Sequence, residues 1–260
     1  MKLLSLNAWG ASQGQLFFDF IKEQAKNTDI FCFQEIFSAK NSAPQISSGA
    51  HMRLFEELEE MLPEFQGIFC ERSSGYDFSG RADFPVRHGL ASFIRNNIRI
   101  KNSQTLPIGP ASLEIQTDPV EGVPKAQVFN LAIGKKELSV VNYHGPALPG
   151  NKLDTPERIG NSQALKAIWE DLSAPAKILG GDFNLMPDTE SIKILEGCGK
   201  NLIREFKIEN TRNEISWKKY HNKQSFADFA FVSSAVKLKN FEVPYNLASD
   251  HLPMVIDFSL

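Results

Sequence analysis

Runs of residues typical of buried strands alternate with runs typical of amphipathic helices along most of this chain, and this alternation limits the folds that it can form. The first two strand-like runs are each followed by a helical run, at residues 14–26 and 53–62. In the middle of the chain, strand-like runs follow one another directly, which indicates hairpins. We therefore expect an α+β (α/β) layered sandwich of mixed sheets covered by helices, and not a purely parallel barrel.

Periodicity and capping residues locate the remaining elements. A helix is expected at residues 155–172, with Thr155 as its N-cap and Pro156 in its first position, and another from Asp188 to Gly197. Strands are expected at residues 2–6, 29–35, 65–71, 89–95, 126–133, 137–144, 177–182, 226–233 and 253–260. Long loops, which are usually functional or mobile, are expected at residues 36–52, 72–88, 145–155 and 211–225.

The bulk composition suits one globular domain without a strong field for nucleic acid. The 260 residues are enough for one large core, and strand-like runs near both ends favour a single domain over residues 1–260. The formal net charge of −3 argues against a protein that coats nucleic acid without sequence preference. It is compatible with an enzyme that has a local basic patch.

The cysteines and the apolar runs indicate the compartment. Cys32, Cys70 and Cys198 are too widely spaced for a zinc site or a disulfide framework, and Cys32 in the run DIFCF is expected to be a buried small side chain. Neither a signal peptide nor a membrane-spanning run is evident. We expect a monomeric cytoplasmic protein without a membrane anchor.

Polar residues stand where several apolar runs end. Asn7 follows KLLSL, Glu35 ends DIFCFQE, His144 ends LSVVNYH, and Asp182 with Asn184 follows KILGG. In layered α/β folds such strand ends gather at one edge of the sheet, where ligands bind. If they meet here, the site holds two carboxylates, two amides and an imidazole, a set that suits a hard cation such as Mg²⁺.

A second group of polar residues precedes the last strand. Asp250 and His251 are adjacent in NLASDHLPMVIDF, and Asp228 lies inside the apolar run FADFAFV. A carboxylate in an apolar strand is rarely left unpaired. Asp228 is therefore expected to hold an imidazole such as that of His251, to raise its pKa and to fix its tautomer.

Each of these residues also has a simpler interpretation. Four of them could form or cap turns: Asn7, Asp182, Asn184 and Asp250. Two could be charges at exposed or edge strand positions, Glu35 and Asp228, and His144 could be a core histidine. Their joint occurrence at strand ends favours a site.

Two of the long loops carry basic residues that could bind a substrate. Residues 211–225 hold Arg212, Trp217 and Lys219, and residues 72–88 hold Arg87. Basic side chains with aromatic ones between them could follow a phosphate backbone and stack a base. The alternative for residues 211–225 is a solvated hairpin tip.

The motifs LNAWG, FQE, NYHG, GGDFN and SDH, in this order, resemble those of the endonuclease/exonuclease/phosphatase superfamily. That superfamily includes deoxyribonuclease I-like enzymes, abasic-site endonucleases, sphingomyelinases, inositol-phosphate phosphatases and tyrosyl-DNA phosphodiesterases. The resemblance covers nearly the whole chain. It implies a deoxyribonuclease I-like four-layer sandwich, in which two packed mixed β-sheets are flanked by helices.

The resemblance also implies a role for each residue that matches a motif. Metal binding, water activation, phosphate contacts and orientation of a histidine are divided among them. Glu35 would bind the metal with Asn7 and Asp250 beside it, Asp182 would position the attacking water, Asn184 and His144 would contact phosphate, His251 would bind phosphate or act as base, and Asp228 would orient His251.

Two features depart from the family pattern. Gly145 stands where the family usually has leucine after the histidine, and no carboxylate partner for His144 is evident, Glu71 included. The wall beside the histidine is therefore expected to differ. The resemblance does not carry a general-acid role to His144.

We predict a divalent-metal-dependent hydrolase of phosphoester bonds that uses Mg²⁺ or Mn²⁺, with a nuclease-type phosphodiesterase of DNA or RNA as the leading hypothesis. One alternative is a phosphatase or phosphodiesterase of a small phosphorylated molecule such as an inositol phosphate, and another is a non-catalytic binding module. A serine hydrolase is disfavoured because the G-x-S-x-G elbow is missing and Ser249 lies two residues from His251.

Overall fold

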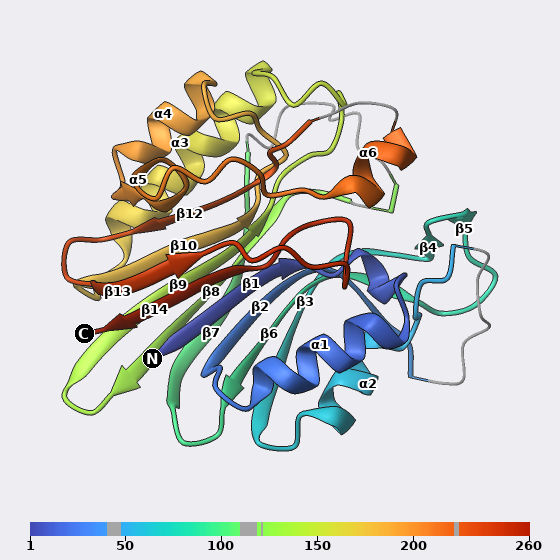
Figure 1. Cartoon of the computed structure of the whole chain (residues 1–260), viewed down its shortest axis with the longest axis horizontal. Helices are drawn as coiled ribbons and strands as arrows, with labels where there is room; N and C mark the ends of the chain where they lie inside the picture. Colours follow the sequence, from blue (N-terminus) through green and yellow to red (C-terminus); the bar gives the residue numbers. More distant parts are fainter. Residues whose placement is uncertain (41–47, 110–118, 121, 221–223) are drawn as a thin grey trace.

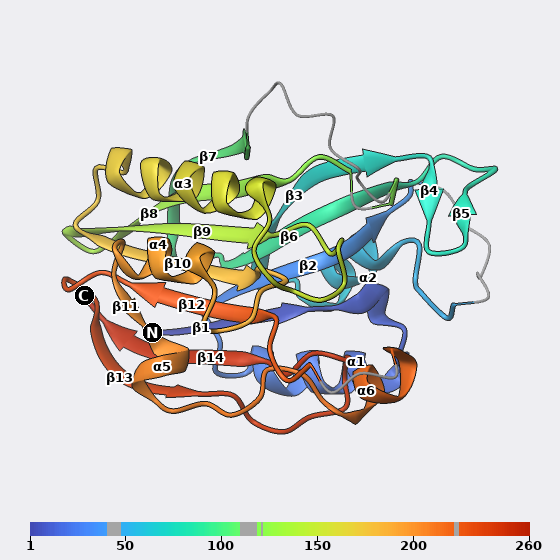
Figure 2. The same ribbon diagram turned by 90° about the horizontal axis from the view of Figure 1, so that it is seen from above.

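Two large mixed β-sheets pack face to face in the computed structural model, and helices cover their outer faces (Figures 1 and 2). The structure describes the whole chain except residues 41–47, 110–118, 121 and 221–223 and the side chains of residues 219 and 220. The layers run helix, sheet, sheet, helix. The predicted four-layer sandwich is therefore confirmed.

One sheet joins the first and the last strands. Its order is β13-β14-β1-β2-β6-β3, and β1 pairs in parallel with β2 and antiparallel with β14. The ammonium group of Met1 donates to the carbonyl of Phe258 at 2.7 Å. The strands are β1 (Lys2–Asn7), β2 (Ile30–Ser38), β3 (Phe65–Ser74), β6 (Arg87–Arg95), β13 (Lys237–Glu242) and β14 (Met254–Ser259).

The other sheet has the order β11-β12-β10-β9-β8-β7. β9 and β10 are parallel neighbours, and their last residues, His144 and Asp182, lie directly opposite each other. The strands are β7 (Arg99–Pro107), β8 (Lys125–Ile133), β9 (Lys136–His144), β10 (Ala176–Asp182), β11 (Lys200–Asn201) and β12 (Asp228–Val232). A separate small hairpin is made by β4 (Tyr76–Asp77) and β5 (Gly80–Arg81).

The helices divide between the two outer faces (Figure 1). α1 (Gln15–Ala25) and α2 (Leu54–Met61) cover the first sheet, and α3 (Pro156–Asp171), α4 (Glu190–Glu196) and α5 (Leu202–Glu205) cover the second. A 3₁₀ turn, η1 (Trp9–Ala11), follows β1, and α6 (Glu214–Tyr220) lies near the end of the sheets where β1 and β10 finish. α3 begins as predicted, because the Thr155 hydroxyl accepts from the Arg158 amide at 3.1 Å.

Strand alternation divides the core into an inner and an outer part. In β1, Leu3 belongs to the cluster between the sheets, whereas Leu4 and Leu6 pack under α1 and α2. Phe129 and Phe258 also face the space between the sheets, whereas Phe229 lies on the opposite face of the second sheet, with Phe183 and Phe231. Since odd-numbered positions of β1 face the second sheet, Asn7 ends the strand on that inner face.

Several boundaries differ from the sequence prediction. β7 and β13 were not expected, because both are edge strands with mostly exposed side chains and lack an apolar alternation. The expected loop 72–88 contains the end of β3 and the β4–β5 hairpin, and the expected loop 211–225 contains α6, so the hairpin-tip interpretation is wrong. α4 begins after Thr189 and not at Asp188.

Two features of the structure bear on the expectations drawn from the cysteines and the apolar runs. Cys32 is buried, its burial raises the pKa of its thiol to about 12, and all three cysteines are free. Among the described residues, no helix combines the length and the apolar character that crossing a membrane requires.

Candidate active site

Asp182 lies at the centre of a group of polar side chains from both sheets. Asn7 Nδ2 donates to its Oδ2 at 3.0 Å, and the Nε2 atoms of His144 and His251 lie 3.6 and 3.7 Å from the same oxygen. Asn7 Nδ2 also donates to Glu35 Oε1 at 2.7 Å. The polar residues that the sequence singles out therefore do meet, at the carboxyl ends of β1, β9 and β10 and at a position within the second half of β2.

Glu35 reaches this group only because β2 is irregular. Phe31 and Phe33 point to the helix-covered face, so regular alternation would send Glu35 the same way. The pairing of β2 with β6 shifts register between Phe33 and Ile36, and Glu35 has a φ of 54°. This bulge turns the carboxylate towards the second sheet, a common use of bulges beside functional sites.

The turn after β10 holds Asp182 and Asn184 in place. Asp182 Oδ1 accepts from the Asn184 amide at 2.8 Å, so Asp182 forms an Asx-turn and faces the site with its other oxygen. Asn184 has a φ of 53°, which asparagine tolerates, and its Nδ2 donates to the Gly145 carbonyl at 3.1 Å. Both interpretations of this stretch, turn former and site residue, are therefore compatible with the geometry.

His251 is held by a carboxylate from the neighbouring β12. Its Nδ1 donates to Asp228 at 2.9 Å, which leaves Nε2 towards Asp182. Burial alone would lower the pKa of His251, but the carboxylates of Asp228, Asp182 and Asp250 together outweigh it and the pKa is raised. Asp250 Oδ2 accepts from Arg212 Nη2 at 2.9 Å, and its Oδ1 lies 3.9 Å from His251 Nε2.

The carboxylates of the site suit a divalent cation. Burial and the neighbouring Asp250 raise the pKa of Glu35, which means that its negative charge is poorly compensated. Burial acts to raise the pKa of Asp182 too, but the His251 imidazole and other cationic neighbours hold it below its ordinary value. Glu35, His144 and Asp182 each offer a ligand atom within 4.8 Å of the others. An oxygen-rich set with one imidazole fits a hard cation.

The side-chain amide of Asn7 does not present its oxygen to the two carboxylates, as a direct metal ligand at this site would. Its Oδ1 accepts from the Trp9 amide at 3.0 Å, and its Nδ2 faces the two carboxylates. Asn7 therefore fixes Glu35 and Asp182 relative to each other through hydrogen bonds.

His144 faces the carboxylates of Glu35 and Asp182 with its Nε2 and has a guanidinium group nearby. Its Nδ1 has no hydrogen-bond partner among the described residues, and burial together with the nearby Arg72 guanidinium holds its pKa well below its ordinary value. Glu71 is exposed on β3. The next residue, Gly145, must be small, because a Cβ there would lie 2.6 Å from a backbone carbonyl of Phe183. The close approach of the Phe183 carbonyl accounts for the glycine at position 145.

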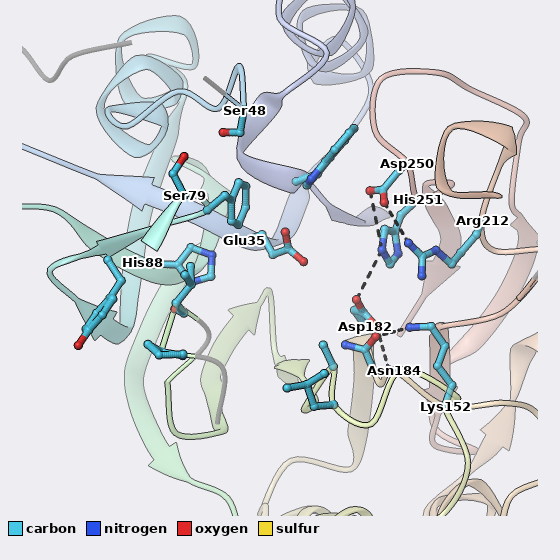
Figure 3. Close-up of a pocket in the computed structure, with 18 of the residues that line it drawn as sticks. Glu35, Ser48, Ser79, His88, Lys152, Asp182, Asn184, Arg212, Asp250 and His251 are labelled. Carbon is cyan, nitrogen blue, oxygen red and sulfur yellow. Dashed lines mark hydrogen bonds and ion pairs between the residues drawn. The ribbon is translucent and has the colours of Figure 1, made fainter. Parts of the chain in front are cut away.

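A pocket of about 850 Å³ opens above these residues (Figure 3). Glu35, Asp182 and His251 line its centre. Its lining also includes the aromatic residues Trp9, Tyr76 and Phe78, together with Ala147, Leu148, Lys152 and Arg212.

Four residues were expected to bind the substrate, and only one of those with a described side chain lines this pocket. Arg212 lines it, whereas Arg87 donates to Ser38 and lies over the Phe69 ring. Trp217 is not among the lining residues. The side chain of Lys219 lies outside the described residues, as do His221 and Lys223.

Ser249 does not act on an imidazole. Its hydroxyl donates to the Asn7 carbonyl at 2.7 Å, and it accepts from the His251 amide, while the imidazole is paired to Asp228. A serine–histidine nucleophile is therefore not formed here.

Lys152 is the charged pocket residue that the sequence did not suggest. Its Nζ donates to Asn184 Oδ1, and burial lowers its pKa to about 8. It lies in an irregular segment whose residues follow no helical or strand period, so no local signal pointed to it. Trp9, Tyr76 and Phe78 were also not among the expected site residues.

Comparisons with known proteins agree with this geometry. The model of the Endonuclease/Exonuclease/phosphatase family matches residues 4–251, and no curated protein matches the chain. The chain is similar to a mannosyl-6-phosphatase of Bacteroides thetaiotaomicron (17% identity, 100% of both chains, TM-score 0.70). It is also similar to the human Nocturnin catalytic domain with bound sulfate (19%, 100% of this chain and 93% of that chain, 0.70) and to D. rerio TDP2 complexed with single-strand DNA product (13%, 100% and 99%, 0.68). At these identities the likeness establishes the shared fold.

Proposed function

Since the chain belongs to the Endonuclease/Exonuclease/phosphatase family, we propose that it hydrolyses a phosphoester bond with Mg²⁺ or Mn²⁺ as its cofactor. One observation carries the proposal: Asn7, His144 and His251 each present a nitrogen within 3.7 Å of the same oxygen of Asp182. A buried carboxylate surrounded in this way stays ionised, so it can accept a hydrogen bond from the attacking water.

The side chains divide the work of hydrolysis. Asp182 accepts a hydrogen bond from the attacking water and aligns it with the phosphorus atom. Asn184 Nδ2 and His251 Nε2 donate to non-bridging phosphate oxygens, where negative charge accumulates in the transition state. Asp228 keeps His251 in the tautomer and charge state that this donation requires.

The cation would be held by Glu35, with Asp250 and Asp182 nearby. When bound, it supplies positive charge to the phosphate oxygens. Asn7 keeps the Glu35 and Asp182 carboxylates at a fixed separation for this ion.

The shape of the site supports a small phosphorylated molecule as substrate. Of the expected nucleic-acid contacts, Arg87 and Trp217 do not line the pocket, and Arg212 is paired with Asp250. Recognition inside a bounded pocket suits a compact ligand. A nuclease-type phosphodiesterase acting at the end of a DNA or RNA strand is the second candidate, because Trp9, Tyr76 and Phe78 in the pocket lining could stack a terminal base.

The test is a metal-supplemented assay of the purified protein and two variants. Asp182→Asn should reduce hydrolysis of p-nitrophenyl phosphoesters by about 10²-fold or more, and a chelator should abolish it. Asp188→Asn is the matched control, because Asp188 is exposed on the same segment. Activity that persists in a chelator would contradict the proposal, and Mn²⁺ binding without turnover of any phosphoester would favour a binding module.

The same assay separates the substrate classes. Inositol phosphates and sugar phosphates represent the small molecules. Single-stranded, duplex, abasic and 5′-tyrosyl DNA and RNA represent the nuclease hypothesis. A kcat/KM that is highest on a polynucleotide would favour the second candidate.

A further inference from the structure

Lys152 is a buried cation on the wall of the pocket, and the hydrolysis described above does not use it. Its side chain is 4% exposed, and its Nζ donates to Asn184 Oδ1 (Figure 3). Among the described residues, this neutral amide is the only group within hydrogen-bond distance of Nζ, and no carboxylate lies within 4.0 Å. The charge of Lys152 therefore lacks a direct counter-charge in the free protein. This is unusual, because a buried ammonium group ordinarily has a carboxylate partner.

The wall that contains Lys152 is closed on its far side. Arg158 is 1% exposed and donates to four backbone carbonyls of the segment 146–153, which anchors that segment to α3. Lys152 itself is buried within the same segment. A phosphate oxygen that faces Nζ therefore faces a wall of packed protein, which suits a bare oxygen better than one that carries a substituent.

The two kinds of phosphoester differ at this position. A phosphodiester has two non-bridging oxygens and one negative charge, whereas a phosphomonoester has three and close to two charges at neutral pH. Asn184, His251 and the cation are enough for the oxygens of a diester. The third oxygen of a monoester needs a further donor, and its extra charge favours a cationic one.

We propose that Lys152 binds the third oxygen of a terminal phosphate group, so that the site selects phosphomonoesters over phosphodiesters. The inference rests on the proposed function and narrows its substrate class. The contact of Nζ with Asn184 Oδ1 holds the ammonium group beside the position of the phosphate.

The test compares two ester classes in two variants. Lys152→Met removes the charge and the donor, and Lys152→Gln removes the charge but keeps a donor for Asn184. The kcat/KM for p-nitrophenyl phosphate should fall about 10-fold to 100-fold in both variants, and that for bis-p-nitrophenyl phosphate by less than about 3-fold. Lys193→Met, at an exposed position of α4, is the matched control and should change neither value.

Binding without turnover gives an independent measurement. Isothermal titration with methyl phosphate and dimethyl phosphate should show a preference of the wild-type protein for the monoester, and Lys152→Met should lose it. Equal losses on both ester classes would overturn the inference, because Lys152 would then act only through Asn184. A wild-type preference for dimethyl phosphate would overturn it as well. Absence of turnover on both esters, with the binding preference intact, would contradict the proposed function and leave the inference standing.

Discussion

Replacing Lys152 by methionine should stabilise the metal-free protein although it damages the site. Burial lowers the pKa of Lys152 from 10.5 to about 8, against the opposing effect of Asp182. The depression corresponds to a cost of about 3 kcal/mol for a charged ammonium group in the folded protein at pH 7. Methionine removes this cost but leaves Asn184 Oδ1 without its donor, which costs about 1 kcal/mol. We expect a net gain of about 2 kcal/mol in the free energy of unfolding.

This gain should disappear at high pH. Between pH 8 and 10.5, the unfolded chain keeps a proton on Lys152 that the folded protein has lost, so the stability of the wild-type protein rises with pH in this window. Below pH 8 the group is charged in both states, and its full cost is present. From pH 7 to pH 9.5 the wild-type protein should gain about 2 kcal/mol relative to Lys152→Met.

Urea denaturation followed by circular dichroism at both pH values, after treatment with a chelator, measures these differences. Lys193→Met serves as control and should stay within about 0.5 kcal/mol of the wild-type protein at either pH. A stability difference between Lys152→Met and the wild-type protein that is the same at both pH values would refute the reasoning. It would mean that Lys152 is solvated, or paired with an anion, in the folded protein.

Three further substitutions test the site. Asp228→Asn should lower kcat by about 10²-fold with little change in KM, because it removes the charge that keeps His251 protonated; an unchanged pH–rate profile would argue against this. Glu35→Gln should abolish the rise in melting temperature that Mn²⁺ gives the wild-type protein, as measured by differential scanning fluorimetry. Gly145→Ala should cost more than about 1 kcal/mol in urea denaturation, whereas Gly150→Ala, with nothing within 4 Å of its added Cβ, should not; equal effects would contradict the clash.

The central strands could be predicted from the sequence because they are buried on both faces. β2 and β9 read as apolar runs, and their polar last residues stand out against them. The edge strands β7 and β13 gave no such signal, since their exposed side chains resemble those of a loop. The apolar pattern of the sequence therefore predicts strands that are buried, but it does not predict edge strands whose side chains are mostly exposed.

The site could be predicted as a set of residues but not as a geometry. Asn7 and Asp182 end regular strands, so alternation alone places them correctly. The Glu35 side chain reaches the site because of a bulge in β2, and the sequence pattern of DIFCFQE does not predict this bulge. Lys152 depends on the carbonyl contacts of Arg158, which form only when the segment packs against α3. Both positions are fixed by tertiary contacts, which a local reading of the sequence does not contain.

The pairing of β1 with β14 has a consequence for how the chain is made. During translation, Leu3 and Leu4 emerge about 250 residues before their partners Ile256 and Val255, a delay of roughly 10 to 50 s at ordinary elongation rates. Throughout that time one edge of a leucine-rich strand has no neighbour and can pair with other nascent chains. The same delay separates Asn7 from Asp250 and His251, so the candidate site of a growing chain is complete only after its last strand has closed the sheet.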